Sequence, residues 1–202
     1  MTDAGITTPA TSKAEKKPPT KRQILTEYVC RECSIMSGDH PEGARKRSAF
    51  RLAARLPIGN SSAAWAELVQ NFPEEIMAGP SADRPNLYET AAYITLMLFA
   101  SAMNHEYGTD LGAAVKMADS TVLRSRLTRV EDSYGEEEVL SNLSPLLNAL
   151  GRKNISTDYG TLSYDIFQLL WTEKSHVSVM QKWERSYAVT KTNNIKEENH
   201  EP

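Results

Sequence analysis

Cys30 and Cys33 have the spacing of a C-x-x-C motif, which binds metal in some proteins and exchanges thiol and disulfide in others. With His40 they would supply three of the four ligands that structural zinc requires, but the sequence contains no second C-x-x-C to complete the set. A redox pair normally lies at the start of a helix that follows a strand, where the helix dipole lowers the thiol pKa, whereas this pair falls in the middle of a predicted helix. We therefore interpret both residues as buried or half-buried thiols, and a zinc or thiol protein is the third of three hypotheses.

Arginines form the more prominent chemical pattern of the chain. Arg47, Arg51 and Arg55 recur every four residues and therefore share one side of a predicted helix, opposite an apolar stripe. Like charges at this spacing repel each other by roughly a few tenths of a kcal/mol per pair, and no acidic residue lies between Glu42 and Glu67 to neutralise them. A phosphate backbone would neutralise this stripe, although an arginine face in contact with solvent would produce the same pattern.

A second set of basic residues lies in the other half of the chain. On the predicted helix whose buried stripe is Leu123, Leu127 and Val130, Arg126 and Arg129 share one flank while Arg124 points elsewhere. Aromatic side chains do not alternate with the basic residues, as they do in sites that stack single-stranded bases, so we expect phosphate contacts without sequence preference. Lys46 belongs to the first basic cluster, and the candidate nucleic-acid-binding residues are Arg45, Arg47, Arg51, Arg55, Lys116, Arg124, Arg126, Arg129, Arg152 and Lys153.

Motifs that would support catalysis are missing from the sequence. It contains no glycine-rich phosphate loop, no G-x-S-x-G and no H-E-x-x-H motif, and its 4 histidines are scattered. We therefore predict a protein that is not an enzyme, has no metal or other cofactor and acts on no small-molecule substrate.

The composition is typical of a soluble globular protein, with 40% hydrophobic and 24% charged residues among 202. Because the net charge is −3, nucleic-acid binding would have to come from basic residues gathered on one face. The most apolar run, residues 91–103, is shorter than the roughly 20 residues that a membrane-spanning helix needs, and no secretory signal is present. Together with the two cysteines, these features predict a cytoplasmic protein without membrane contact.

The elements that must position the basic residues are predicted to be helices. Apolar residues recur at helical spacing, no segment alternates with period two, and glycine or proline separates the segments. The expected helices include residues 22–37, 41–56 and a central, apolar helix at 87–107. We therefore expect an all-α fold of about eight or nine helices without a sheet, in which two helical bundles pack end to end.

The two bundles are predicted to span residues 22–108 and 109–189, between a disordered basic tail at 1–21 and a polar tail at 190–202. Gly112 lies inside a predicted helix at the start of the second bundle, where glycine costs about 1 kcal/mol relative to alanine. A close approach of another backbone is the natural reason for a glycine there. We expect Gly112 to be the joint that sets the two bundles against each other.

Several short motifs, each weak alone, follow one another along residues 22–188. They are Gly43-Ala44-Arg45 with Ala49-Phe50-Arg51-Leu52-Ala53, Asp110-Leu111-Gly112-Ala113-Ala114, Ser125-Arg126-Leu127, Leu143-Ser144-Pro145-Leu146-Leu147, Asp158-Tyr159-Gly160 with Leu162 and Asp165-Ile166, and Trp183-Glu184-Arg185 with Tyr187. In order and spacing, the sequence resembles the CasB family, the small subunit of the type I-E CRISPR complex called Cascade.

The resemblance implies a non-catalytic, all-helical subunit that is present in two copies along a crRNA-guided complex. It also implies contacts with the backbone and large subunits of Cascade, and a basic surface that holds DNA of the R-loop after the guide RNA has paired with its target. The positions that match the family's basic sites are Arg51 and Arg126, followed by Arg47 and Lys116. The alternative hypothesis is a helical scaffold that binds only protein and pairs its arginines with acidic partners.

Overall fold

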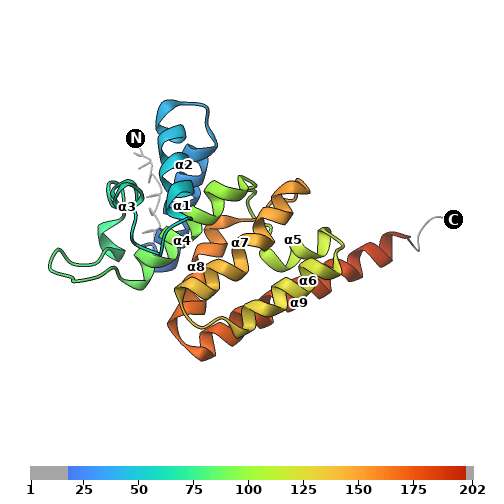
Figure 1. Ribbon diagram of the computed structural model, residues 1–202. Helices are drawn as coiled ribbons and strands as arrows, with labels where there is room; N and C mark the ends of the chain where they lie inside the picture. Colours follow the sequence, from blue (N-terminus) through green and yellow to red (C-terminus); the bar gives the residue numbers. More distant parts are fainter. Residues whose placement is uncertain (1–17, 199–202) are drawn as a thin grey trace, which may run out of the picture.

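The computed structural model describes residues 18–198, with side chains through residue 190, and it is built from helices (Figure 1). Within this part of the chain, nine α-helices and two 3₁₀ turns follow one another, and no strand is present. An isolated bridge between His105 and Thr157 is the one β-type contact that these residues make. The prediction of an all-α fold is confirmed. Most of the expected basic tail lies outside the described residues, as does the end of the polar tail.

The first two helices begin at residues that cap them. Helix α1, Lys21–Ser37, begins at a capping box in which the side chains of Thr20 and Gln23 bond reciprocally to the backbone. Helix α2, Pro41–Ala53, begins with proline at its first position and is capped by His40. It ends three residues earlier than expected. The short helix α3, Ser62–Val69, and the 3₁₀ turn η1, Glu74–Ile76, then lead to the central helix.

The central helix is α4, Leu87–Ala102, which is buried on nearly all sides from Glu89 to Ala100. It packs against α1, α2 and α3 from its own half of the chain and against α7 and α8 from the other half. The expected extension to residue 107 is wrong, because Met103 adopts a left-handed conformation (φ 54°) and ends the helix. Backbone carbonyl groups in the last turn of α4, such as that of Ala100, can therefore accept hydrogen bonds from neighbouring elements.

The second half of the chain contains five further helices. They are α5 (Leu111–Met117), α6 (Thr121–Arg129), α7 (Glu136–Arg152), α8 (Tyr159–Trp171) and α9 (Glu173–Glu198), with the 3₁₀ turn η2 (Val130–Asp132) between α6 and α7. Helix α5 packs against α9, and α6 packs against α7. Among residues 18–198, no helix is both long and apolar enough to span a membrane.

Gly112 permits the close backbone approach that its position inside a helix predicted. A Cβ atom added there would lie 2.1 Å from the carbonyl oxygen of Trp183 in α9. Because α5 and α9 both belong to the second half, the expectation that Gly112 joins the two halves is wrong.

The halves meet instead through α7 and α8, which both pack against α4, and through the packing of α8 against α1. A Cβ on Gly160 would lie 2.3 Å from the sulfur of Cys30, so glycine is needed where α8 crosses α1. One continuous cluster of buried apolar side chains runs through both halves. The division of the chain near residue 108 stays a prediction.

Candidate nucleic-acid interface

The arginine stripe of α2 lines a surface hollow, which we call the α2 groove. Arg47, Arg51 and Arg55 surround it together with Ala44, Ser48 and Leu52, and its volume is about 420 Å³. Arg47 and Arg51 therefore share one side of α2 as predicted, whereas Arg55 lies in the turn after the helix and still lines the hollow. Ser48 also lines the groove with a hydroxyl that can donate or accept a hydrogen bond, and the pattern of charges does not point to it.

Two arginines of the α2 groove are fixed by the ends of neighbouring helices. Arg47 donates through Nη1 to the carbonyl oxygens of Met36 and Gly38 at the end of α1, the second bond measuring 2.8 Å. Arg51 donates through Nε to the carbonyl oxygen of Ala100, 2.6 Å away in the last turn of α4. These carbonyls form the negative ends of the helix dipoles, so they hold the guanidinium groups without cancelling their charge as a carboxylate would. Each guanidinium keeps further N–H donors for an anion.

The first basic cluster is partly neutralised inside the protein. The side chain of Arg45 is 56% exposed, but its Nη1 lies 2.7 Å from Oε1 of Glu67. Lys46 is fully buried, and its Nζ lies 2.6 Å from Oε2 of Glu32. Placing Lys46 in a surface cluster was therefore wrong, since its ammonium compensates a buried carboxylate. Arg45 lies outside the α2 groove, and its charge is balanced by Glu67.

A second basic hollow lies between α6 and α7, and we call it the α6–α7 groove. Its volume is about 490 Å³, and Arg126 from α6 meets Arg152 and Lys153 from the end of α7 around it. Lys153 also donates to the carbonyl oxygen of Ala118, 3.3 Å away. The groove contains neutral polar side chains that the sequence analysis did not single out, namely Ser120, Ser144 and Asn148.

Arg124 and Lys116 face α9 and lie outside both grooves. Arg124 pairs with Glu184, and the hydrogen bond to this carboxylate raises the pKa of the guanidinium. Its Cζ lies 4.3 Å from the ring centroid of Tyr187, and Nζ of Lys116 lies 5.4 Å from the same centroid. The expectation that Arg124 points away from Arg126 is confirmed. Arg129 is exposed and lines neither groove.

The last turn of α4 lies next to residues that line or adjoin both grooves. On one side, the carbonyl of Ala100 receives the hydrogen bond from Arg51. On the other side, a Cβ added to Gly151 would lie 2.8 Å from the carbonyl oxygen of Ala102, so the end of α7 presses closely against α4. Arg152 directly follows this glycine. The fold thus gathers two basic groups from opposite halves of the sequence around one helix end.

The two cysteines of the C-x-x-C motif pack inside the protein. Cys30 and Cys33 are free and buried, as predicted. Burial raises the pKa of Cys30 to about 11, and it raises the pKa of Cys33 as well. His40 accepts a hydrogen bond from the Gly43 amide, 3.2 Å from Nδ1, as the cap of α2. Within residues 18–198, no group of three or more His, Cys, Asp or Glu side chains is placed to hold a metal ion.

Comparison with known proteins identifies one family and several similar structures. The model of the family described as CRISPR-associated protein Cse2 matches residues 46–187, a range that contains every candidate residue except Arg45. No curated protein sequence matches the chain. The fold is similar to that of CasB from Thermobifida fusca, with a TM-score of 0.61 and 21% identity over 82% of this chain and 96% of that one.

Two structures from Thermus thermophilus show the same similarity of fold. CasB from this organism has a TM-score of 0.64 at 18% identity, over 84% of this chain and 99% of that one. A CRISPR-associated protein of the Cse2 family from the same organism has a TM-score of 0.61 at 19% identity, with the same coverage of both chains. At these identities the structures show a shared fold, and the roles of individual side chains must be argued from the geometry of this chain.

Proposed function

Because this chain belongs to the family of CRISPR-associated Cse2 proteins, we propose that it is a non-catalytic small subunit of a crRNA-guided surveillance complex of the Cascade type. In this role it holds the backbone of nucleic acid without sequence preference and stabilises the R-loop in antiviral defence. Its partners in the proposal are the backbone and large subunits of the complex, the target DNA and a second copy of the chain.

The observation that carries the proposal is the pair of basic grooves near the last turn of α4. Within the described part of the chain, Arg55, Arg126 and Arg152 have no carboxylate partner. Arg47 and Arg51 bond only to backbone carbonyls, so they keep their charge as well. Guanidinium groups with spare N–H donors match the oxygens of phosphate, which makes a phosphate backbone the ligand that best fits both grooves.

The lining of the grooves favours binding without sequence preference. Serine, asparagine and aliphatic side chains accompany the basic residues, and no aromatic ring among the described residues lines either groove to stack a base. Phosphate contacts position a nucleic acid but carry no sequence information. Arginine remains protonated at neutral pH, so these side chains serve as donors to an anion and not as general bases. This supports a binding role and not a catalytic one.

The net charge of −3 makes modest affinity the expected property of the isolated subunit. In an assembly this is sufficient, because docking onto partner subunits raises the effective concentration of the basic grooves near the DNA. The role in the R-loop is therefore best tested in the assembled complex, whereas phosphate contact itself can be tested with the isolated chain at low salt.

The test uses the complex purified with its guide RNA and supplied with matching target DNA, whose displaced strand is detected by permanganate reactivity. The variant combines Arg55→Ala, Arg126→Ala and Arg152→Ala. A control of equal charge combines Arg84→Ala, Lys174→Ala and Arg185→Ala, which are exposed residues outside both grooves. We expect the groove variant to lose R-loop signal while the composition of the complex is unchanged, and the control to behave as wild type. Unchanged signal in both variants would support the helical scaffold instead.

A further inference from the structure

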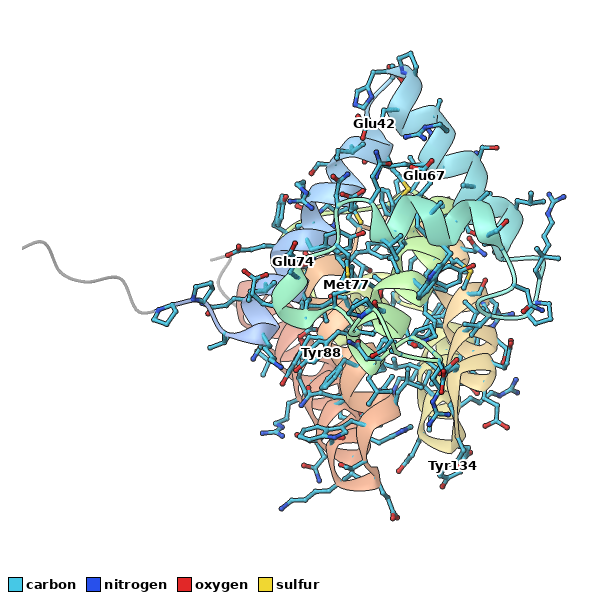
Figure 2. All side chains as sticks on the ribbon, turned by 90° about the vertical axis from the view of Figure 1, so that its left-hand side faces the viewer. Glu42, Glu67, Glu74, Met77, Tyr88 and Tyr134 are labelled. Carbon is cyan, nitrogen blue, oxygen red and sulfur yellow. The ribbon has the colours of Figure 1, made fainter. Side chains whose placement is uncertain are left out.

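A third surface hollow is lined by acidic side chains, and no lysine or arginine among the described residues lines it. Its volume is about 550 Å³, and it lies between the loop that follows η2 and the turn from α8 to α9. We call it the aromatic–acidic groove, after Tyr134, Trp171, Glu131, Asp132 and Glu173, which line it. Figure 2 shows Tyr134 at the end of the molecule opposite Glu42, which lies in the first turn of α2.

Two large aromatic side chains of this groove are exposed to solvent. Tyr134 is 77% exposed and Trp171 is 58% exposed. Trp171 is held in place by the ring of Phe167, 5.7 Å away between centroids, which in turn stacks on Tyr88 at 4.4 Å. Exposed aromatic rings beside a preformed hollow are typical of surfaces that recognise another molecule.

The three carboxylates of the groove have no counter-ion. Glu131, Asp132 and Glu173 are exposed, and within the described part of the chain none of their side chains takes part in an ion pair or a hydrogen bond. This concentration of negative charge repels phosphates and attracts cations. The groove is therefore complementary to a positively charged group and not to nucleic acid.

The walls of the groove are fixed by internal hydrogen bonds. The His176 ring lies between the carbonyl oxygens of Leu169 and Val130, at 3.3 and 3.1 Å, so its N–H donates to one of them where α9 packs against η2. On the other wall, the backbone amide of Tyr134 donates to Glu138 at 2.5 Å. A ligand therefore meets a surface that is already organised, which lowers the entropic cost of binding.

We propose that the aromatic–acidic groove docks an arginine-bearing segment of a partner protein. A planar guanidinium can stack against the exposed ring of Trp171 while its N–H donors reach the neighbouring carboxylates. A lysine ammonium is strongly hydrated and cannot stack in this way, so arginine is the better match. The inference stands independently of nucleic-acid binding.

The groove and the nucleic-acid interface can be occupied at the same time. Helix α7 has 17 residues, which corresponds to a length of about 25 Å. Its N-cap, Gly135, lines the aromatic–acidic groove, whereas Arg152 at its other end lines the α6–α7 groove. A protein partner at one end of α7 therefore leaves phosphate contacts at the other end free.

Titration with N-acetyl-arginine amide tests the chemistry of the groove directly. The readout is the indole N–H resonance of Trp171 in the nitrogen-labelled protein, assigned through Trp171→Phe. We expect a saturable shift with the arginine amide and none with the uncharged isostere N-acetyl-citrulline amide. Asp132→Asn with Glu173→Gln should weaken the arginine response about fivefold. Equal responses to both amides, no response to either, or a response insensitive to the two carboxylate substitutions would overturn the proposal.

Site-specific crosslinking identifies the occupant in the native assembly. Tyr134, which is largely exposed, is replaced by p-benzoylphenylalanine in the chain that is isolated with its bound partners. Support requires a crosslinked peptide that belongs to a different protein and contains arginine, and whose yield falls with Asp132→Asn and Glu173→Gln. Crosslinks to a second copy of this chain, crosslinks to nucleic acid, or the absence of any crosslink would contradict the proposal.

Discussion

At the scale of single residues, the arginines of the α2 groove combine two roles. Arg51 bonds to the carbonyl of Ala100 and also lines the groove, whereas the side chain of Arg55 lines the groove without any hydrogen-bond partner in the described part of the chain. Arg51 belongs to the last turn of α2, and Arg55 lies in the turn that follows the helix. They therefore allow the structural role and the binding role of an arginine to be separated.

Arg51→Ala is expected to lower stability, because the carbonyl of Ala100 loses its charged donor. The expected cost is about 1 kcal/mol in the free energy of unfolding. Urea unfolding would show this as a lower midpoint with an unchanged slope. Arg55→Ala is the matched control and should stay within about 0.5 kcal/mol of wild type. Equal midpoints for the two variants would show that the bond from Arg51 contributes nothing.

The thiol of Cys30 provides a prediction about pH. Burial raises its pKa from 9.0 to about 11 in the folded protein. A raised pKa favours the protonated form, so the thiol's contribution to stability is complete below pH 9 and is lost as the pH rises from 9 to 11. At pH 8 the folded chain should hold about a hundredfold less Cys30 thiolate than the unfolded chain.

Alkylation by iodoacetamide measures this difference, because only the thiolate reacts. At pH 8 the native protein should therefore react about a hundredfold more slowly than the protein in urea. Similar rates in the two conditions would show an accessible thiol with an unshifted pKa and would contradict the burial of Cys30.

At the scale of elements, the sequence predicted helices well and their partners poorly. Periodicity and caps identified the helices because both signals lie within a few residues. The end of α4 was misplaced because Met103, and not Gly108, adopts the left-handed conformation that ends it. The partner of Gly112 could not be found from the sequence, since Trp183 lies 71 positions later and nothing local marks it.

The candidate site was likewise predictable where its residues lie in one segment of the chain, and not where two helices bring them together. The spacing of Arg47, Arg51 and Arg55 predicted the α2 groove because all three lie in one short segment, α2 and the turn that follows it. The meeting of Arg126 with Arg152 depends on the packing of α6 against α7, which no local pattern reports. The burial of Lys46 was missed for the same reason, because its partner Glu32 belongs to another helix.

Gly112→Ala tests the contact between α5 and α9. The added methyl group would overlap the backbone of Trp183, and backbone cannot rotate away as a side chain can. We expect a loss of about 2 kcal/mol, although alanine alone favours the helix by about 1 kcal/mol. Gly79→Ala, where a Cβ would meet nothing within 4 Å, should leave the thermal midpoint nearly unchanged. A Gly112→Ala protein as stable as wild type would contradict the close approach.

At the scale of the whole molecule, charge is segregated although the net charge is small. Helix α7 begins with Glu136, Glu137 and Glu138 and ends at Arg152, an order that matches the helix dipole. The acidic end adjoins the aromatic–acidic groove, and the basic end adjoins the α6–α7 groove. The fold therefore has one surface that suits an anionic ligand and another that suits a cationic one, as expected if the chain contacts both nucleic acid and protein as proposed.

The central claim is that the two basic grooves contact phosphates, and the salt dependence of binding to an unrelated DNA duplex tests it most directly. Each phosphate contact contributes about −0.9 to the slope of log affinity against log salt concentration. The combined Arg55→Ala, Arg126→Ala and Arg152→Ala variant should show a slope that is shallower by about 2 to 3 than that of wild type. The combined Arg84→Ala, Lys174→Ala and Arg185→Ala control should keep the wild-type slope. If the two variants have the same slope, or if the wild-type chain binds no DNA even at low salt, the assignment of the grooves to nucleic acid is wrong.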